Sequence, residues 1–237
     1  VQKNVRVSTL RKNSIRQRES VMDAVNSVGK LDQLPRARLM SGATPLEEMP
    51  NLSKRLGGVR LLDKRDDMTG LAFGGNKVRQ VEFYRGEAES SGADTIVITG
   101  AVQSNFVRLA AASARKLGMD CHIQLEDRVP KNDPTYKTSG NVLIDRMLGA
   151  TLHTFPEGED EMAADRNLEQ IAGNLRKNGR KPYVIHLAPG HTPLGALGYV
   201  DAARELLEQC AAMGLTPDEI VLASGSGHTQ GGVLFGL

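Results

Sequence analysis

The sequence predicts an α/β protein in which parallel β-sheets are flanked by helices. Two features predict this class: short apolar strands alternate with helical segments from residue 95 onward, and turns rich in glycine and polar residues lead into the helices. Strands that alternate with helices form parallel sheets joined by crossover connections. The length of 237 residues is sufficient for one large domain or two small ones.

Composition narrows the function classes. The formal net charge is +2, so no basic or acidic excess points to nucleic acid or a membrane surface as the main partner. No apolar run approaches the roughly 18–20 residues that a membrane span needs. The cysteines, Cys121 and Cys210, are too few for a disulfide framework, and we expect them to be reduced thiols in a cytoplasmic protein.

Residues 1–30 are expected to form a basic N-terminal extension. Lysine and arginine recur in this stretch with no acid before Glu19, and the chain begins at Val1 rather than at Met. An acid-free start rich in arginine and serine is typical of an organelle transit peptide, and equally of a disordered basic arm. Both interpretations remain open, so import into an organelle is the alternative to a cytoplasmic location.

The pattern is irregular before residue 94. Proline and glycine punctuate residues 34–50, which predicts a loop, and residues 52–56 fit a short helix. A strand is expected at 59–64. After the Gly74-Gly75 turn, apolar residues at helical spacing predict a helix over 76–91.

Strands and helices follow one another regularly from residue 95. The β-branched run at 95–99 is typical of a strand buried on both faces. An alanine-rich helix follows the turn at 100–105 and ends at Gly118, because glycine is a common helix stop. Further strands are expected at 121–125, 152–155, 183–187 and 219–224, and further helices at 140–148, 162–177 and 194–213.

The first turn with chemical potential is Gly74-Gly75-Asn76-Lys77. Glycine lets the backbone turn sharply and lets a ligand approach closely. A lysine in the first turn of a helix is disfavoured by the helix dipole, which lowers the pKa of its amine. A lowered pKa suits an amine that acts as a nucleophile. The alternative is a solvated surface lysine.

Two further turns carry polar side chains. Gln103, Ser104 and Asn105 follow a buried strand, where they either cap a helix or bind a carboxylate or phenolate. The glycine-rich turn at 224–232 opens a helix and can cradle a phosphate through its backbone amides. Because it lacks the lysine of a nucleotide P-loop, we expect a single phosphate monoester rather than a nucleotide.

Together these motifs resemble the family of D-cysteine desulfhydrase and 1-aminocyclopropane-1-carboxylate (ACC) deaminase. The resemblance rests on residues 64–70 and 74–79, GAVQSN at 100–105, LGALGYV at 194–200 and VLASGSGHTQ at 221–230. It implies a two-domain pyridoxal 5′-phosphate (PLP)-dependent enzyme of fold type II, the tryptophan-synthase-β type, that acts on a small amino acid. Related enzymes are commonly homodimers.

The resemblance also implies a division into domains. The larger, PLP-binding domain would comprise residues 31–79 and 189–237, and the smaller α/β domain would comprise residues 80–188. Family members continue beyond Leu237, so the larger domain would be incomplete at its C-terminus.

Site residues carry over one by one. Lys77 would be the catalytic lysine that binds the cofactor as a Schiff base and moves a proton, with the cofactor-binding residue Asn76 before it. Asn105 would contact the cofactor's phenolate oxygen and the substrate, and Ser104, beside Gln103, would bind the substrate carboxylate and assist acid–base catalysis. The phosphate would lie on a loop formed by Gly225, Ser226, Gly227 and Thr229. No metal site is predicted.

Several positions depart from the family pattern. Gln80 stands where the family has a lysine that neutralises phosphate, which should weaken cofactor binding. His228 lies in the phosphate loop in place of a small residue. His191 lies in a loop that commonly reads Gly-Gly-Ser-Asn, so it is a candidate substrate contact or a surface histidine.

D-cysteine desulfhydrase, which releases pyruvate, sulfide and ammonia, is the expected activity because residues 194–200 look closest to that enzyme. ACC deaminase and L-cysteate sulfo-lyase are alternatives, since the same cofactor supports all three. The alternative from another class is a truncated or degenerate relative without catalysis. Gln80 and His228 favour this alternative, while Lys77, Ser104 and Asn105 oppose it.

Overall fold

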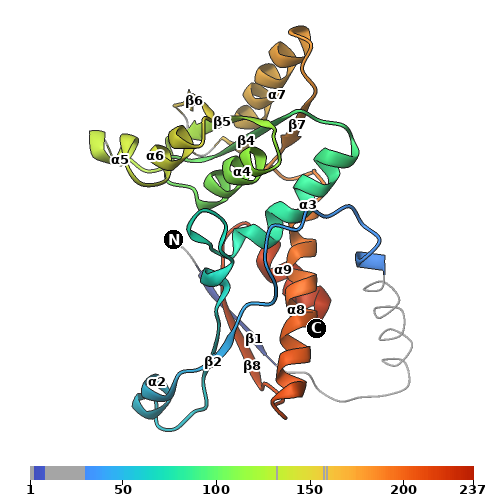
Figure 1. Ribbon diagram of the computed structural model, residues 1–237. Coiled ribbons are helices and arrows are strands. Elements are labelled where there is room, and N and C mark those ends of the chain that lie inside the picture. The colour runs from blue at the N-terminus through green and yellow to red at the C-terminus, as the bar shows by residue number, and fades with distance from the viewer. Residues whose placement is uncertain (1–2, 9–29, 132, 157, 159) are drawn as a thin grey trace.

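The computed structural model describes residues 3–8, 30–131, 133–156, 158 and 160–237. Its upper part in Figure 1 holds a parallel sheet, its lower part holds α8, α9 and the pair β1–β8, and α3 runs between them. The strands are β1 Lys3–Ser8, β2 Leu46–Glu48, β3 Leu62–Lys64, β4 Thr95–Ala101, β5 Asp120–Glu126, β6 Thr151–Phe155, β7 Pro182–Ile185 and β8 Glu219–Ser224. The α-helices are α2 Pro50–Arg55, α3 Lys77–Ser90, α4 Asn105–Lys116, α5 Pro134–Thr138, α6 Gly140–Met147, α7 Glu161–Lys177, α8 Leu197–Ala212 and α9 His228–Gly236. Short 3-10 helices lie at Asp66–Met68, Leu71–Phe73 and Leu194–Ala196.

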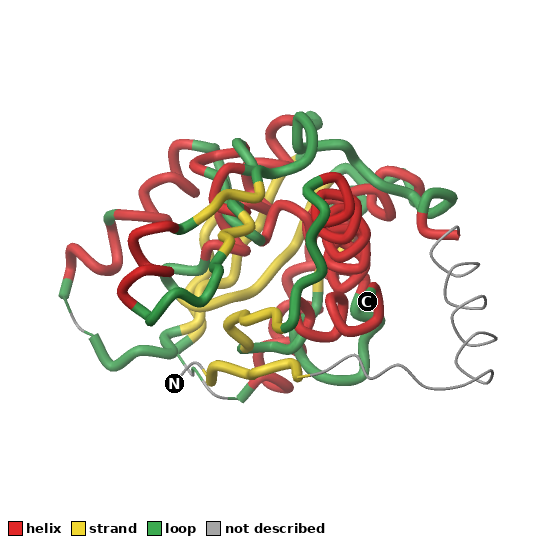
Figure 2. Tube along the Cα trace, turned by 90° about the horizontal axis from the view of Figure 1, so that it is seen from below, coloured by secondary structure: helices red, strands yellow, loops and turns green. Residues whose placement is uncertain are grey.

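The parallel sheet has four strands in the order β6-β5-β4-β7. Ile96 and Ile98 of β4 pack on one face in the main core cluster, which includes α4, while Val97 packs on the other face with Leu168 and Ala172 of α7. The strand is therefore buried on both faces, as its β-branched composition predicted. Figure 2 shows strands in the middle of the molecule with helices on either side, and a further strand at its lower edge. The predicted α/β class is confirmed for this part of the chain.

The strand β8 pairs antiparallel with β1, with Lys3 opposite Ser224 and Ser8 opposite Glu219. The antiparallel pairs β1–β8 and β2–β3 are additional to the predicted parallel sheet, and the sequence contained no indication of the strand at 3–8. Backbone N–H and C=O groups make the pairs of a ladder, so an extension without a hydrophobic pattern can still supply a strand. Residues 1–2 and 9–29 of the expected extension lie outside the described residues.

The helix α3 is buried along most of its length, including the polar side chains of Arg79, Glu82 and Arg85. It packs against both α4 and α8. The domain boundary expected between residues 79 and 80 therefore falls inside one continuous helix, and the division into domains stays a prediction.

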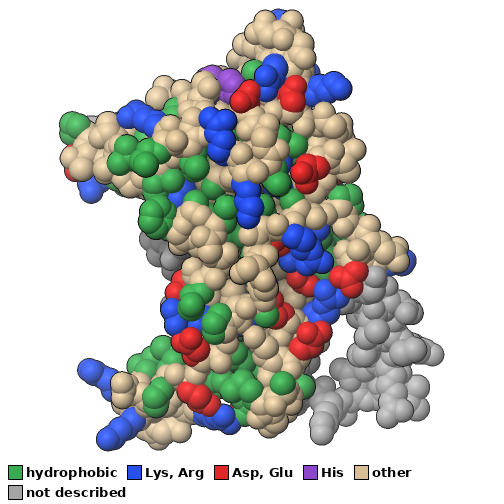
Figure 3. Space-filling view, in the orientation of Figure 1, with side chains coloured by type: hydrophobic (Ala, Val, Ile, Leu, Met, Phe, Trp, Pro, Cys, Tyr) green, Lys and Arg blue, Asp and Glu red, His purple; other side chains and the backbone are tan. Residues whose placement is uncertain are grey.

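The face of the molecule drawn in Figure 3 carries Lys and Arg side chains interspersed with Asp and Glu. Within the described residues, no helix has the length and apolar character to cross a membrane.

Candidate active site

The structure brings the three polar turns together around one cavity of about 320 Å³. Lys77 comes from the first turn, Gln103 and Ser104 from the second, and Ser226 and His228 from the third. These turns are far apart in the sequence. The three turns therefore line a single cavity, which is the arrangement expected where strands and loops lead into helix N-termini.

Lys77 is the first residue of α3 and lines the cavity. Burial lowers the pKa of its amine. Within the described part of the chain its Nζ makes no hydrogen bond or ion pair. The pKa of the His228 imidazole is also lowered, first by burial and second by the positive charge of Lys77. The two groups are therefore neighbours. A partly buried amine with a lowered pKa and no hydrogen-bond partner is suited to nucleophilic attack.

Glycine is required at positions 74 and 75, in the turn that leads into α3. Gly74 has φ +68°, and a Cβ there would lie 2.1 Å from the carbonyl oxygen of Asp67. Gly75 has φ +114°. Only glycine adopts such backbone conformations without strain. The two glycines therefore let the chain turn sharply into α3 and set Lys77 at the cavity.

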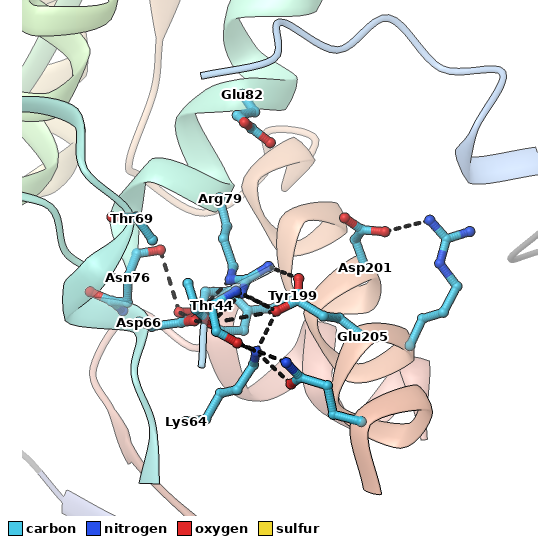
Figure 4. Close-up of polar contacts among 12 residues, drawn as sticks. Thr44, Lys64, Asp66, Thr69, Asn76, Arg79, Glu82, Tyr199, Asp201 and Glu205 are labelled. Atoms are coloured by element: carbon cyan, nitrogen blue, oxygen red, sulfur yellow. Dashed lines mark hydrogen bonds and ion pairs between the residues drawn. The ribbon is translucent and has the colours of Figure 1, made fainter. Parts of the chain in front are cut away.

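A partly buried ion-pair network lies beside the same turn (Figure 4). Arg79, whose side chain is 0 % exposed, donates to Asp66 at 2.9 Å and to Glu205 at 3.0 Å. The Tyr199 hydroxyl lies 2.8 Å from Asp66 Oδ2 and 3.3 Å from the carbonyl oxygen of Asn76. The motif residues Lys64, Asp66, Arg79 and Tyr199 thus support the turn that carries Lys77 and do not line the cavity.

The network is charged at neutral pH. Burial opposes the ionisation of Glu205, but hydrogen bonds and charges from Arg79 and Lys64 dominate and lower the pKa of Glu205 to about 2. Burial and the Asp66 carboxylate raise the pKa of Tyr199, so its hydroxyl stays protonated and can donate.

The second turn is fixed by its own side chains. Ser104 Oγ accepts from the N–H of Val107 at 3.3 Å and so caps α4, which leaves its hydroxyl proton free to donate. Gln103 donates to the carbonyl of Tyr136 at 2.6 Å and accepts from the N–H of Asn141 at 2.9 Å. Gln103 therefore ties this turn to the start of α6.

Asn105 is exposed at the first turn of α4 and is not among the residues that line the cavity. Its Oδ1 accepts from Asn141 Nδ2 at 3.0 Å and from Arg108 Nη1 at 3.2 Å. Asn141 could not be recognised from the sequence as a neighbour of this turn, because an asparagine at a helix start is usually a cap.

The third turn opens α9. Ser226 lines the cavity, and Gly227, at φ +86°, is the N-cap of α9. A Cβ built on Gly225 would meet no atom within 4 Å, so this stretch of backbone is open to a ligand. The N-terminus of a helix presents unpaired N–H groups and a positive dipole end, which suits a phosphate. Gln80 also lines the cavity, and its Nε2 donates to Thr229 Oγ1 at 3.1 Å.

The structure does not place His191 with these residues. Its ring stacks on His186 at 3.8 Å, and its Nε2 lies 3.2 Å from Asp165. Sequence reasoning missed Arg128, which lines the cavity and pairs with Glu126 at 2.7 Å. The available signal was its position directly after β5, at the carboxyl end of a parallel strand.

Comparisons with known proteins agree with this geometry. The family model described as "Pyridoxal-phosphate dependent enzyme" matches residues 37–237. The 1-aminocyclopropane-1-carboxylate deaminase of Burkholderia vietnamiensis is 42% identical over 208 residues, and that of Bradyrhizobium sp. BTAi1 is 40% identical over 209 residues. Both alignments cover 87% of this chain and 61% of the relative.

Solved structures give the same result. The ACC deaminase homologue has a TM-score of 0.72 and 36% identity, and the match covers 88% of this chain and 60% of that chain. Diaminopropionate ammonia lyase from Escherichia coli in its apo form has a TM-score of 0.61 at 20% identity, with coverage of 88% and 58%, which supports the fold alone.

Proposed function

The chain belongs to the family of pyridoxal-phosphate dependent enzymes, and from this premise we propose that its cavity binds PLP and that the protein releases ammonia from a small amino acid. The proposal concerns the whole protein, since this chain spans 61% of the length of the curated relatives it matches. One observation carries it: the partly buried Lys77 lines the same cavity as Ser226 of the glycine-rich turn.

The residues present fit the cofactor. Lys77 supplies an amine with a lowered pKa for covalent attachment to the aldehyde carbon. The backbone N–H groups around Ser226 and Gly227, with the hydroxyls of Ser226 and Thr229, would hold the phosphate. Asn105 remains the proposed phenolate contact. It lies outside the cavity lining, so this role requires its amide to turn away from Asn141.

PLP, when bound, acts as an electron sink for the Cα of the attached amino acid. The chain's own part is to bind the substrate and move protons. Lys77 Nζ would take and return a substrate proton: the Cα proton of D-cysteine or L-cysteate, and a ring-methylene proton of ACC, whose Cα carries no hydrogen. Ser104, whose hydroxyl proton is free, would donate to the substrate carboxylate, and Gln103 would keep the turn in place. The His191 ring lies in another cluster, so we propose no substrate role for it.

Two substrates are the first candidates. D-cysteine is supported by the resemblance of residues 194–200 to desulfhydrases, and ACC is supported by the name that the most similar relatives carry. L-cysteate is a third. Product analysis separates them: D-cysteine yields sulfide, L-cysteate yields sulfite, and ACC yields ammonia and a keto acid without a sulfur product. A homodimer also remains a proposal, for which a solution mass measurement is the test.

Titration with PLP tests the cofactor proposal. We expect visible absorption that is lost in Lys77→Ala, and, after borohydride reduction, a PLP mass addition on the peptide that contains Lys77. Lys177→Ala, which removes an exposed lysine, is the matched control and should keep both signals. Modification at other lysines only would overturn the proposal. A Lys77 adduct without turnover of any candidate would favour the non-catalytic alternative.

A further inference from the structure

Three metal-ligating side chains meet on the far side of the parallel sheet from α4. Asp165 belongs to α7, His186 directly follows β7, and His191 lies in the loop that leads toward α8. Their ligand atoms all lie within 4.8 Å of one another. Asp165 Oδ2 lies 3.2 Å from His186 Nδ1 and 3.2 Å from His191 Nε2.

The cluster contains buried polar atoms that lack hydrogen bonds. The Asp165 side chain is 9% exposed, and neither of its carboxylate oxygens has a hydrogen-bond partner in the described structure. The buried His186 Nδ1 likewise has no hydrogen-bond partner in the described structure. Burying a carboxylate without hydrogen bonds is costly, so such atoms are rare unless another ligand satisfies them. Asp165 Oδ2 and His186 Nδ1 lie at ion-pair distance, but their relative orientation does not allow a hydrogen bond.

The two separations from Asp165 Oδ2 suit a tetrahedral metal ion. The His186 and His191 rings stack in parallel with centroids 3.8 Å apart, so their in-plane lone pairs do not converge, and the exposed His191 ring would have to turn to bind the same ion. Ligands at about 2.0–2.1 Å from zinc are separated from one another by about 3.4 Å in a tetrahedral site. Both contacts of Asp165 Oδ2 are close to this separation, at 3.2 Å. Imidazole and carboxylate are ligands that zinc accepts.

The surroundings of His186 also match those of a metal ligand. Its other ring nitrogen, Nε2, lies 3.1 Å from Glu169 Oε1. Metal-binding histidines usually donate their second ring N–H to a carboxylate, which fixes the tautomer and orients the ring. Glu169 would therefore keep Nδ1 of His186 unprotonated and available to the metal.

We propose that Asp165, His186 and His191 bind a divalent ion of the zinc class, with Glu169 as the outer partner of His186 and a water as fourth ligand. His191, whose side chain is 45% exposed, leaves that fourth position accessible to solvent. The ion clamps α7 to the segment that leaves the parallel sheet after β7. The site is independent of the PLP cavity, which His191 does not line.

A second histidine pair provides the matched control. His122 and His153 also stack, and their ring nitrogens approach to 3.1 Å, but no carboxylate joins them in a metal-ligating group of the described residues. Removing His153 should therefore leave zinc binding unchanged.

Zinc binding to the chelator-stripped protein tests the proposal. Titration of Zn²⁺ against a chromophoric competitor should show one tight site per chain in the wild type. His191→Ala, at a partly exposed position that tolerates truncation, should weaken it at least 100-fold, and Glu169→Gln should weaken it about 10–100-fold. Co²⁺ in place of zinc should show the visible bands of a four-coordinate ion, and these should be absent in His191→Ala. Wild-type protein without a tight site, or His191→Ala and His153→Ala that bind like the wild type, would overturn it.

Discussion

Gln80 occupies the position from which a side chain of α3 reaches the glycine-rich turn. Its amide donates to Thr229 at 3.1 Å, so the geometry of a phosphate contact is present without a positive charge. Hydrogen bonds to charged groups contribute more than neutral ones, by about 1 kcal/mol. A cation at position 80 would add this charge without changing the position of the side chain.

Gln80→Lys should therefore tighten PLP binding by about fivefold, because it adds a cation beside the proposed phosphate position. The measurement is a PLP titration of the apoprotein followed by absorption. Gln170→Lys, at an exposed position of α7, adds the same charge elsewhere and is the control. Equal affinities in wild type and Gln80→Lys would place the phosphate away from α3.

At the level of the elements, the close approach of α3 and α8 explains the glycines of the 194–200 motif. A Cβ on Gly198 would lie 2.1 Å from the carbonyl oxygen of Arg79, and one on Gly195 would lie 2.9 Å from the Tyr84 ring. The motif is thus a packing surface. It allows the backbone of α8 to touch α3 just below Lys77.

Gly198→Ala should destabilise the protein by about 1–3 kcal/mol, because the added methyl group forces the two helices apart. Gly173→Ala in α7 is the opposite case, since its Cβ would meet no atom within 4 Å, and should stabilise by up to about 1 kcal/mol. Urea unfolding of both variants measures the difference. A Gly198→Ala protein as stable as Gly173→Ala would contradict the packing interpretation.

For the whole molecule, the network around Arg79 connects segments that are distant in sequence. Thr44, Asp66 and Glu205 all contact the Arg79 guanidinium, and Lys64 pairs with Glu205. Because the folded state lowers the pKa of Glu205 from 4.5 to about 2, its ionisation favours folding. This contribution is fully present above about pH 4.5 and is lost as the pH falls toward 2.

Glu205→Gln should lower the free energy of unfolding at pH 7 by about 1–3 kcal/mol, because it weakens charge-assisted hydrogen bonds to Arg79 and Lys64. The difference from wild type should shrink below pH 4.5, where the wild-type carboxylate begins to lose its advantage. Denaturant unfolding at pH 7 and pH 3 gives both values, and Glu208→Gln, an exposed position on α8, is the control. A difference that stays constant with pH would exclude the ionised Glu205 as its source.

The sequence by itself determined the alternation of strands and helices in residues 95–213, because hydrophobic period and glycine stops are local properties. It also determined the three turns of the cavity, through the glycines and polar residues that they require. Only the tertiary structure decided that β1 pairs with β8, and that His191 lies with Asp165 and His186 rather than at the cavity. Strand pairing and side-chain clusters depend on contacts between distant segments, and no local pattern encodes which segments meet in space.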